Sequence, residues 1–200
     1  MTSINELEYD LNNILDYLDK ETEPYWPKSK DMFRSFIICP YNEFKVVILG
    51  QDPYYTKGVA TGLCFDSDPP QPSLKNILKE IGPGAIWGDE LANQGVLLLN
   101  TALTVLEGKP GSHLKLWEDF TLKVIEWINS SFDNIVWMLW GSYSKGYSKY
   151  VTNTTHLILK AGHPSPLNTS KDKFLGCNHF SLCNDFLESK GLEKIKWKKD

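Results

Sequence analysis

The segment Val46-Val47-Ile48-Leu49-Gly50-Gln51-Asp52-Pro53-Tyr54-Tyr55 joins an apolar run to a group of polar and aromatic residues. An unbroken run of Val, Ile and Leu is typical of a strand that is buried on both faces, as in the middle of a parallel sheet. Ligands of open α/β sheets bind beyond the carboxyl ends of the strands, so Asp52 is a candidate site residue. Pro53 restricts the backbone beside it. An isolated Asp-Pro pair also occurs in ordinary turns, so the rest of the chain has to support this interpretation.

Three later segments repeat the order of an apolar run followed by a polar residue. They are 96–99 with Asn100, 135–140 with Ser142, and 156–159 with His163. Short runs of this kind predict buried strands. Right-handed crossovers between such strands make a parallel sheet and bring their carboxyl ends to one edge. We therefore expect Asp52 and the three later polar residues to lie together.

Helical periodicity fills the segments around these strands. The expected helices are 4–18, 32–38, 72–81, 114–129 and 180–187. Pro72 is suited to the first turn of its helix, and Gly82-Pro83-Gly84 ends that helix. Alternating helices and strands predict an α/β fold: a three-layer α/β/α single domain, residues 1–200, around a central four-stranded parallel sheet.

Length and composition limit the class of protein. Two hundred residues fit one domain, and 42% apolar residues without a run near ~18 predict no membrane span. No secretory leader is visible, so we expect an intracellular protein, cytoplasmic, or nuclear in a eukaryotic or viral host. The four cysteines lack the spacing of zinc or iron–sulfur sites. We expect reduced thiols and a site with no metal and no cofactor.

The charges are unevenly distributed along the chain. The formal net charge is −4, and residues 1–31 hold eight acids against three lysines. Residues 140–174 instead hold one acid, Asp172, and five lysines: Lys145, Lys149, Lys160, Lys171 and Lys173. A local cationic face on an acidic body is compatible with a phosphate-bearing ligand. A solvated basic stretch without a ligand would have the same composition.

Common hydrolase and nucleotide-binding motifs do not match. A nucleophile elbow requires G-x-S-x-G, whereas the serine that follows Gly141 comes directly after it. The chain has no P-loop, and Gly50-Gln51-Asp52 does not match the dinucleotide-binding fingerprint. The polar edge of the predicted sheet must therefore serve another chemistry.

Six segments taken together resemble the motifs of family-1 uracil-DNA glycosylases. They are 50–54 (Gly-Gln-Asp-Pro-Tyr), 62–65 (Gly-Leu-Cys-Phe), 97–101 (Leu-Leu-Leu-Asn-Thr), 140–142 (Trp-Gly-Ser), 163–167 (His-Pro-Ser-Pro-Leu) and 176–180 (Gly-Cys-Asn-His-Phe). The similarity extends in order from about Trp26 to Trp197. It implies a metal-independent enzyme of base excision repair that flips a uracil nucleotide out of DNA, hydrolyses its N-glycosidic bond, and leaves an abasic site.

The resemblance assigns roles around the base. His163 would donate a hydrogen bond to uracil O2 as negative charge develops there, and Asp52 would orient water and stabilise the cationic sugar. Asn100 would distinguish uracil from cytosine through its paired donor and acceptor. Phe65 would stack on the base, Tyr54 would exclude the 5-methyl group of thymine, and Gln51 would add a backbone contact.

The resemblance also assigns contacts to DNA. Leu167 would enter the space that the flipped nucleotide leaves. The residues that it places at phosphates are Ser73, Ser142 and Ser165. Lys149 is expected at a phosphate because it belongs to the basic stretch, and Tyr55 because it stands where the family usually has His. We expect single- or double-stranded uracil-containing DNA as the substrate and a monomeric protein. The sequence does not identify an inhibitor or a replication partner.

Several positions depart from the family pattern. The family usually has His at Tyr55, different residues at 56–57 and 59–61, a Lys-Lys-Gly-Ser stretch at 146–149, and Ser at Asn168. These departures flank DNA contacts or the loop that holds water, so uracil recognition is expected to be intact. They favour, as an alternative, a catalytically weak DNA-binding or complex-bridging module on the same fold. A glycosylase for another damaged pyrimidine is disfavoured by Tyr54 and Asn100.

Overall fold

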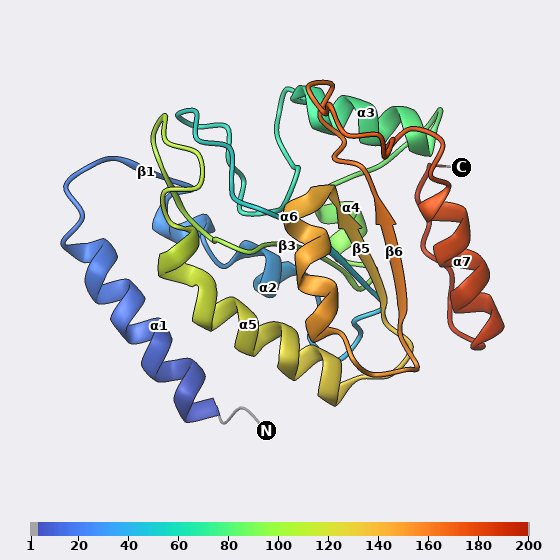
Figure 1. Ribbon diagram of the computed structural model, residues 1–200, viewed down its shortest axis with the longest axis horizontal. Helices are drawn as coiled ribbons and strands as arrows, with labels where there is room; N and C mark the ends of the chain where they lie inside the picture. Colours follow the sequence, from blue (N-terminus) through green and yellow to red (C-terminus); the bar gives the residue numbers. More distant parts are fainter. Residues whose placement is uncertain (1–3, 200) are drawn as a thin grey trace.

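Four parallel strands form the centre of the protein (Figure 1). The computed structural model describes residues 4–199, with side chains from residue 7, so residues 1–3 and 200 and the Ile4 side chain lie outside the description. The strands, in the spatial order β3-β2-β5-β6, are β3 (Val96–Asn100), β2 (Val46–Gly50), β5 (Val136–Trp140) and β6 (Leu157–Ala161). The prediction of a central four-stranded parallel sheet is confirmed.

Helices cover both faces of the sheet. Val47 and Leu49 of β2 belong to a core formed with α1 (Ile4–Asp19), α2 (Arg34–Ile38) and α5 (Leu114–Ser131). Val46 and Ile48, which point to the other face, pack with α3 (Pro72–Ile81) and α7 (His179–Ser189). Every residue of β2 is buried, because the sheet has helices on both sides. The predicted three-layer α/β/α arrangement is confirmed.

Several short elements were not predicted. They are the antiparallel pair β1 (Tyr25–Trp26) and β4 (Val105–Leu106), the helices α4 (Asp89–Ala92) and α6 (Gly141–Gly146), and the 3₁₀ turns η1 (Ser29–Asp31) and η2 (Tyr147–Tyr150). Each is too short to show a clear hydrophobic period. The basic C-terminal segment also packs more closely than its composition indicates, since Trp197 is 5% exposed.

The strand order determines where a ligand can bind. The chain goes from β2 to β3 on one side and then returns to place β5 on the other side of β2. Such a reversal creates a crevice at the carboxyl ends of the central strands. In Figure 1 the arrowheads of β5 and β6 point to this edge, and α3 lies above it. Among the described helices, none is long and apolar enough to cross a membrane.

Candidate active site

A cavity of about 180 Å³ lies at the carboxyl edge of the sheet. Its lining includes eight residues predicted from the sequence: Gln51, Asp52, Tyr54, Tyr55, Phe65, Ser73, Asn100 and His163. Pro53, Ala60, Leu63 and Pro110 complete the lining and were not among the predicted site residues. Strand ends meet at one edge, as expected, and form a partly open site whose lining includes aromatic rings and amides.

Asn100 lies where β3 ends beside β2. It pairs with Gly50 in the sheet register and is 6% exposed. A Cβ atom on Gly50 would lie 2.3 Å from Asn100 Oδ1, so only glycine leaves room for this amide. The glycine that ends the apolar run therefore positions the neighbouring side chain that is expected to read the base.

The Asp52 carboxylate is held from two directions. The Gly111 N–H donates to Asp52 Oδ2 at 2.6 Å, and Gln51 Nε2 donates to Oδ1 at 3.3 Å. Burial raises the pKa of Asp52 above its ordinary value, although these hydrogen bonds oppose the shift. Gly111 is a functional residue that the sequence analysis missed, because nothing in its turn sequence points to a carboxylate 59 positions earlier.

His163 is oriented by its own loop. The Ser165 N–H donates to His163 Nδ1 at 3.0 Å, so the neutral ring carries its proton on Nε2. Burial lowers the pKa of His163, which favours this neutral form. Gly141 has a φ of +88°, and a Cβ there would lie 3.1 Å from the imidazole. The ring can therefore act as a neutral hydrogen-bond donor.

Phe65 forms an aromatic wall of the cavity. Its backbone is left-handed, with a φ of +58°, and its ring centroid lies 5.7 Å from those of both His163 and Trp140. Trp140 is fixed in turn, because its Nε1 donates to His179 Nδ1 at 2.9 Å. Tyr54 stands elsewhere in the lining, and burial raises its pKa to about 12, so its hydroxyl stays neutral.

A second cavity of about 200 Å³ adjoins the first and shares Gln51 and His163 with it. The further polar residues in its lining are Ser142, Tyr143, Ser144, Lys145, Asn168 and Ser170. Ser165 does not line it but belongs to a neighbouring hollow, and its Oγ accepts the Leu167 N–H at 3.2 Å. The Leu167 side chain is 85% exposed and has no apolar surface to cover it.

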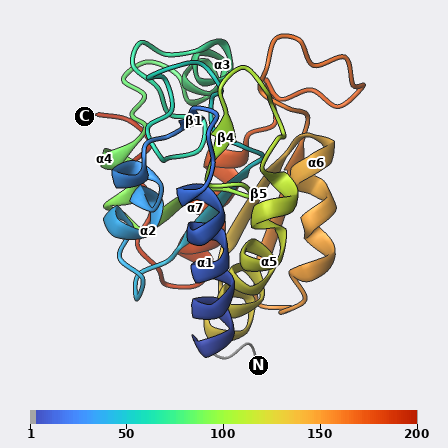
Figure 2. The same cartoon turned by 90° about the vertical axis from the view of Figure 1, so that its left-hand side faces the viewer.

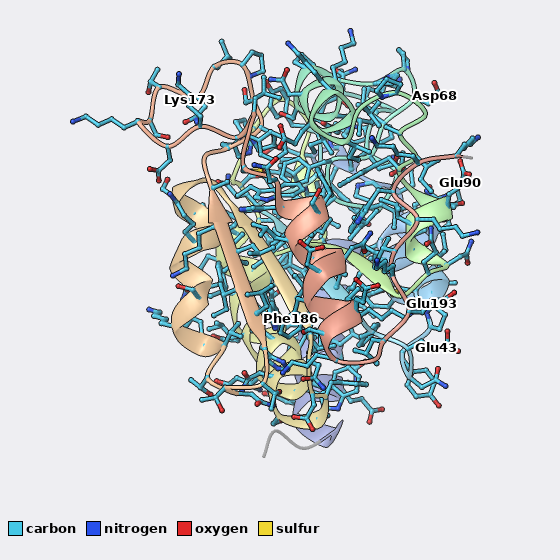
Figure 3. The ribbon with its side chains drawn as sticks, turned by 90° about the vertical axis from the view of Figure 1, so that its right-hand side faces the viewer. Glu43, Asp68, Glu90, Lys173, Phe186 and Glu193 are labelled. Atoms are coloured by element: carbon cyan, nitrogen blue, oxygen red, sulfur yellow. The ribbon has the colours of Figure 1, made fainter. Side chains whose placement is uncertain are left out.

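Lys149 is not brought to either cavity. It lies on η2, after α6 has run from the site toward the opposite edge of the sheet (Figure 1). Its ammonium lies 4.9 Å from the Tyr150 ring centroid. Lys173 instead lies on the loop between β6 and α7, across α7 from Glu90, Glu193 and Glu43 (Figure 3). No cluster of His, Cys, Asp and Glu that could hold a metal occurs within residues 4–199.

Comparisons with known proteins agree with this geometry. Residues 36–188 match the family model described as the uracil DNA glycosylase superfamily. The chain is 46% identical to a uracil-DNA glycosylase of Coxiella burnetii, over 94% of this chain and 87% of that protein. It is 44% identical to a uracil-DNA glycosylase of Flavobacterium johnsoniae, over 88% and 85% of the two chains.

Solved structures of uracil-DNA glycosylases have the same fold. The crystal structure of mimivirus uracil-DNA glycosylase superposes with a TM-score of 0.80 at 22% identity, covering 98% of this chain and 89% of that one. A mimivirus UNG variant in complex with UGI gives a TM-score of 0.82 at 25% identity, over 98% and 83% of the two chains. The chain therefore belongs to the uracil-DNA glycosylase superfamily, and the prediction of a family-1 member is confirmed.

Proposed function

We propose that the cavity at the sheet edge binds a uracil flipped out of DNA and that Asp52 and His163 carry the hydrolysis of its N-glycosidic bond. The protein is a uracil-DNA glycosylase of base excision repair, as its family and its relatives over most of the chain indicate. The observation that supports these site residues most strongly is their convergence in one cavity from separate strand ends.

The reaction breaks the bond between C1′ of the sugar and N1 of uracil. The bonding electrons leave with the base, so the base gains negative charge and the sugar gains positive charge. His163 can donate its Nε2–H to O2 of the departing base, and the Asp52 carboxylate can face the cationic sugar. Water then bonds to C1′, and the proton that it gives up ends on the uracil anion, which yields free uracil and an abasic site. Asp52 is held by the Gly111 N–H, which limits its movement during these steps.

Base selection would rest on three side chains of the same cavity. The Asn100 amide can pair with O4 and N3–H of uracil and would present the wrong pattern to cytosine. Phe65 would stack on the base, and Tyr54 would exclude a 5-methyl group by steric contact. Gln51 O accepts hydrogen bonds from the Thr101 hydroxyl at 2.7 Å and the Ala102 N–H at 3.0 Å, so a backbone contact from Gln51 would use its N–H.

The DNA backbone would lie along the rim of the site. Ser73 and Tyr55 line the base cavity, Ser142 lines the second cavity, and Ser165 shapes the turn that presents Leu167. We propose phosphate contacts for Ser73, Tyr55, Ser142 and Ser165, and insertion of Leu167 into the duplex. Lys149 remains a proposed phosphate contact at a greater distance from the cavities.

We propose that residues 1–200 act as a single domain and a monomer inside the cell, on single- or double-stranded uracil-containing DNA. A mimivirus relative forms a complex with UGI, and we propose that this inhibitor is a candidate partner here as well. The alternative, a catalytically weak DNA-binding module, draws on the altered residues around Tyr55. The lining keeps the residues that the resemblance assigns to uracil recognition, Gln51, Tyr54, Phe65 and Asn100, which favours the enzyme.

One assay separates these two functions. The protein is incubated with a uracil-containing oligonucleotide in EDTA, and abasic sites are then cleaved with alkali. Strand cleavage at the uracil position is the expected result, with a thymine-containing oligonucleotide as the control. Binding without cleavage would support the non-catalytic module instead.

A further inference from the structure

The loop between β6 and α7, residues 162–178, is closed by its own hydrogen bonds. Asn168 Nδ2 donates to the Asp172 carbonyl at 3.1 Å, and the Ser170 hydroxyl donates to the same carbonyl at 2.9 Å. A Cβ on Gly162 would lie 2.0 Å from that oxygen, so the loop crosses tightly over its own first residue. The Asp172 carbonyl therefore accepts the hydrogen bonds that hold the loop together, and the Asp172 carboxylate takes no part in them.

The Asp172 carboxylate forms an ion pair with α6. Lys145 Nζ lies 2.5 Å from Asp172 Oδ2, and the two side chains are 24% and 62% exposed. Figure 2 shows the loop standing out beside the start of α6. Lys145 also lines the second cavity, which shares His163 with the base cavity. Among the described residues of that lining it is the only Lys, Arg, Asp or Glu.

Asn168 uses one donor and one acceptor of its amide within the loop. Its Nδ2 is used by the Asp172 carbonyl, and its Oδ1 accepts the Ser170 N–H at 3.1 Å. Ser142 is exposed and in the same lining, so a phosphate there would meet one hydroxyl and the Lys145 ammonium. The cation of this cavity is therefore Lys145, and its partner is the Asp172 carboxylate, which is mostly exposed to solvent.

We propose that Lys145 binds a phosphate of the substrate DNA in the second cavity and that Asp172 is a built-in competitor for that lysine. This inference rests on the proposed function for its ligand. Exposed ion pairs are weak, so a phosphate can replace the carboxylate. The lysine ammonium is a point charge on a flexible stem and can turn between the two anions.

Competition by Asp172 should be visible in the DNA affinity of substituted proteins. Replacing Asp172 by Asn keeps the carbonyl that holds the loop but removes the negative charge, so DNA binding should tighten. Replacing Lys145 by Met should weaken binding several-fold and reduce the slope of log affinity against log salt by ~0.9. Because Asp172 acts through Lys145, the gain from Asp172→Asn should disappear when Lys145 is already Met.

The test measures fluorescence anisotropy of a duplex that carries an abasic-site analogue, at salt concentrations from about 50 to about 200 mM. The proteins are the parent, Asp172→Asn, Lys145→Met and the double variant. The matched control is Glu188→Gln, which removes one acid from an ion pair with Lys194 at 2.8 Å, at the end of α7 away from the cavities. We expect Asp172→Asn to tighten binding about threefold at the lowest salt, and the control to change it less. Lys145→Gln replaces Lys145→Met if thermal melting shows that the latter unfolds early.

Additive effects of the two substitutions, or a gain from Asp172→Asn no larger than that of Glu188→Gln, would overturn the inference. The EDTA cleavage assay on the parent keeps this failure distinct from failure of the proposed function. If the parent releases uracil and the two substitutions are additive, only the proposed role of Asp172 is rejected. If the parent neither cleaves nor binds the duplex, the proposed function is rejected as well.

Discussion

The base cavity and the β6–α7 loop meet at His163 but are built in different ways. In the cavity, Asn100 is 6% exposed and the Asp52 carboxylate is held by a backbone N–H from a distant segment. In the loop, Leu167 is 85% exposed, and many of the hydrogen bonds join residues close in sequence. Residues at strand ends are positioned by the two cores of the protein, whereas the loop combines these local bonds with a few long-range contacts, such as Asn76 Nδ2 to the Pro164 carbonyl and the Lys145–Asp172 ion pair. We infer that substitutions can change the affinity for DNA without changing the chemical step at the base.

Two of the departures from the family pattern lie at the solvent-exposed side of the site. Tyr55 is 45% exposed, and Asn168 belongs to the self-closed loop. The residues that line the base cavity on the strand ends keep the family motif. Substitutions in the cavity should therefore affect the chemical step, and substitutions on the exposed side should affect mainly DNA binding.

The largest effect is expected at His163. Replacing it with Ala removes the donor that stabilises charge on the departing base, so single-turnover cleavage should fall by ~10²–10³. His156→Ala, the same change at the other end of β6, is the control, because His156 lies outside both cavities. A loss under about fivefold in the chemical step would remove His163 from the mechanism.

Asp52→Asn should slow the reaction and stabilise the fold. Burial raises the pKa of Asp52, so the folded protein resists the charged form that dominates at neutral pH. The resulting loss of stability is complete above the raised folded pKa and absent below the ordinary aspartate pKa. The variant should therefore have a higher free energy of unfolding than the parent at pH 7.

Urea unfolding of both proteins at several pH values measures this difference. The advantage of Asp52→Asn should shrink as the pH falls toward the ordinary aspartate pKa, because the parent carboxylate then becomes protonated. A variant that is less stable at pH 7 would indicate that the Gly111 hydrogen bond outweighs the cost of burying the charge.

Leu167→Ala tests the exposed side of the comparison. Leu167 would fill the gap left by a flipped nucleotide, so its loss should slow uracil release from duplex DNA by about tenfold. Release from single-stranded DNA should be almost unchanged, because no base stack has to be opened there. Leu175→Ala, which alters a 41%-exposed leucine of the same loop, is the matched control. Equal losses on both substrates would mean that Leu167 does not act as a wedge.

Much of the fold and the base cavity was predictable, because buried strands leave strong local patterns. The apolar runs that predicted β2, β3, β5 and β6 begin or end within two residues of the observed strands. Once the strands are parallel, their polar ends must share an edge. This is why Asp52 and His163, 111 positions apart in sequence, were expected together.

The remainder depends on contacts that leave no local pattern. The Gly111 N–H reaches Asp52 across the fold, and only the tertiary structure reveals it. Helix α6 has no apolar period, so the sequence did not show that Lys149, on η2, lines neither cavity. Lys145, not Lys149, is the lysine of this segment that lines a cavity.

The smallest effect is expected at Tyr55, where the cavity meets the exposed surface. Its side chain lines the cavity, and its carbonyl accepts the Gly108 N–H at 3.0 Å, which holds the backbone in place. A tyrosine hydroxyl there can donate one hydrogen bond to a phosphate but carries no charge at neutral pH. Tyr55→Phe should therefore weaken DNA binding by ~0.5–1.5 kcal/mol, as for an ordinary neutral hydrogen bond.

Tyr55→His should tighten binding mainly below about pH 6.5, where imidazole is cationic. Binding measured at about pH 5.5 and about pH 8 separates the two properties. Equal gains from Tyr55→His at both pH values, or no loss in Tyr55→Phe, would place the phosphate elsewhere and leave Tyr55 as part of the cavity wall alone.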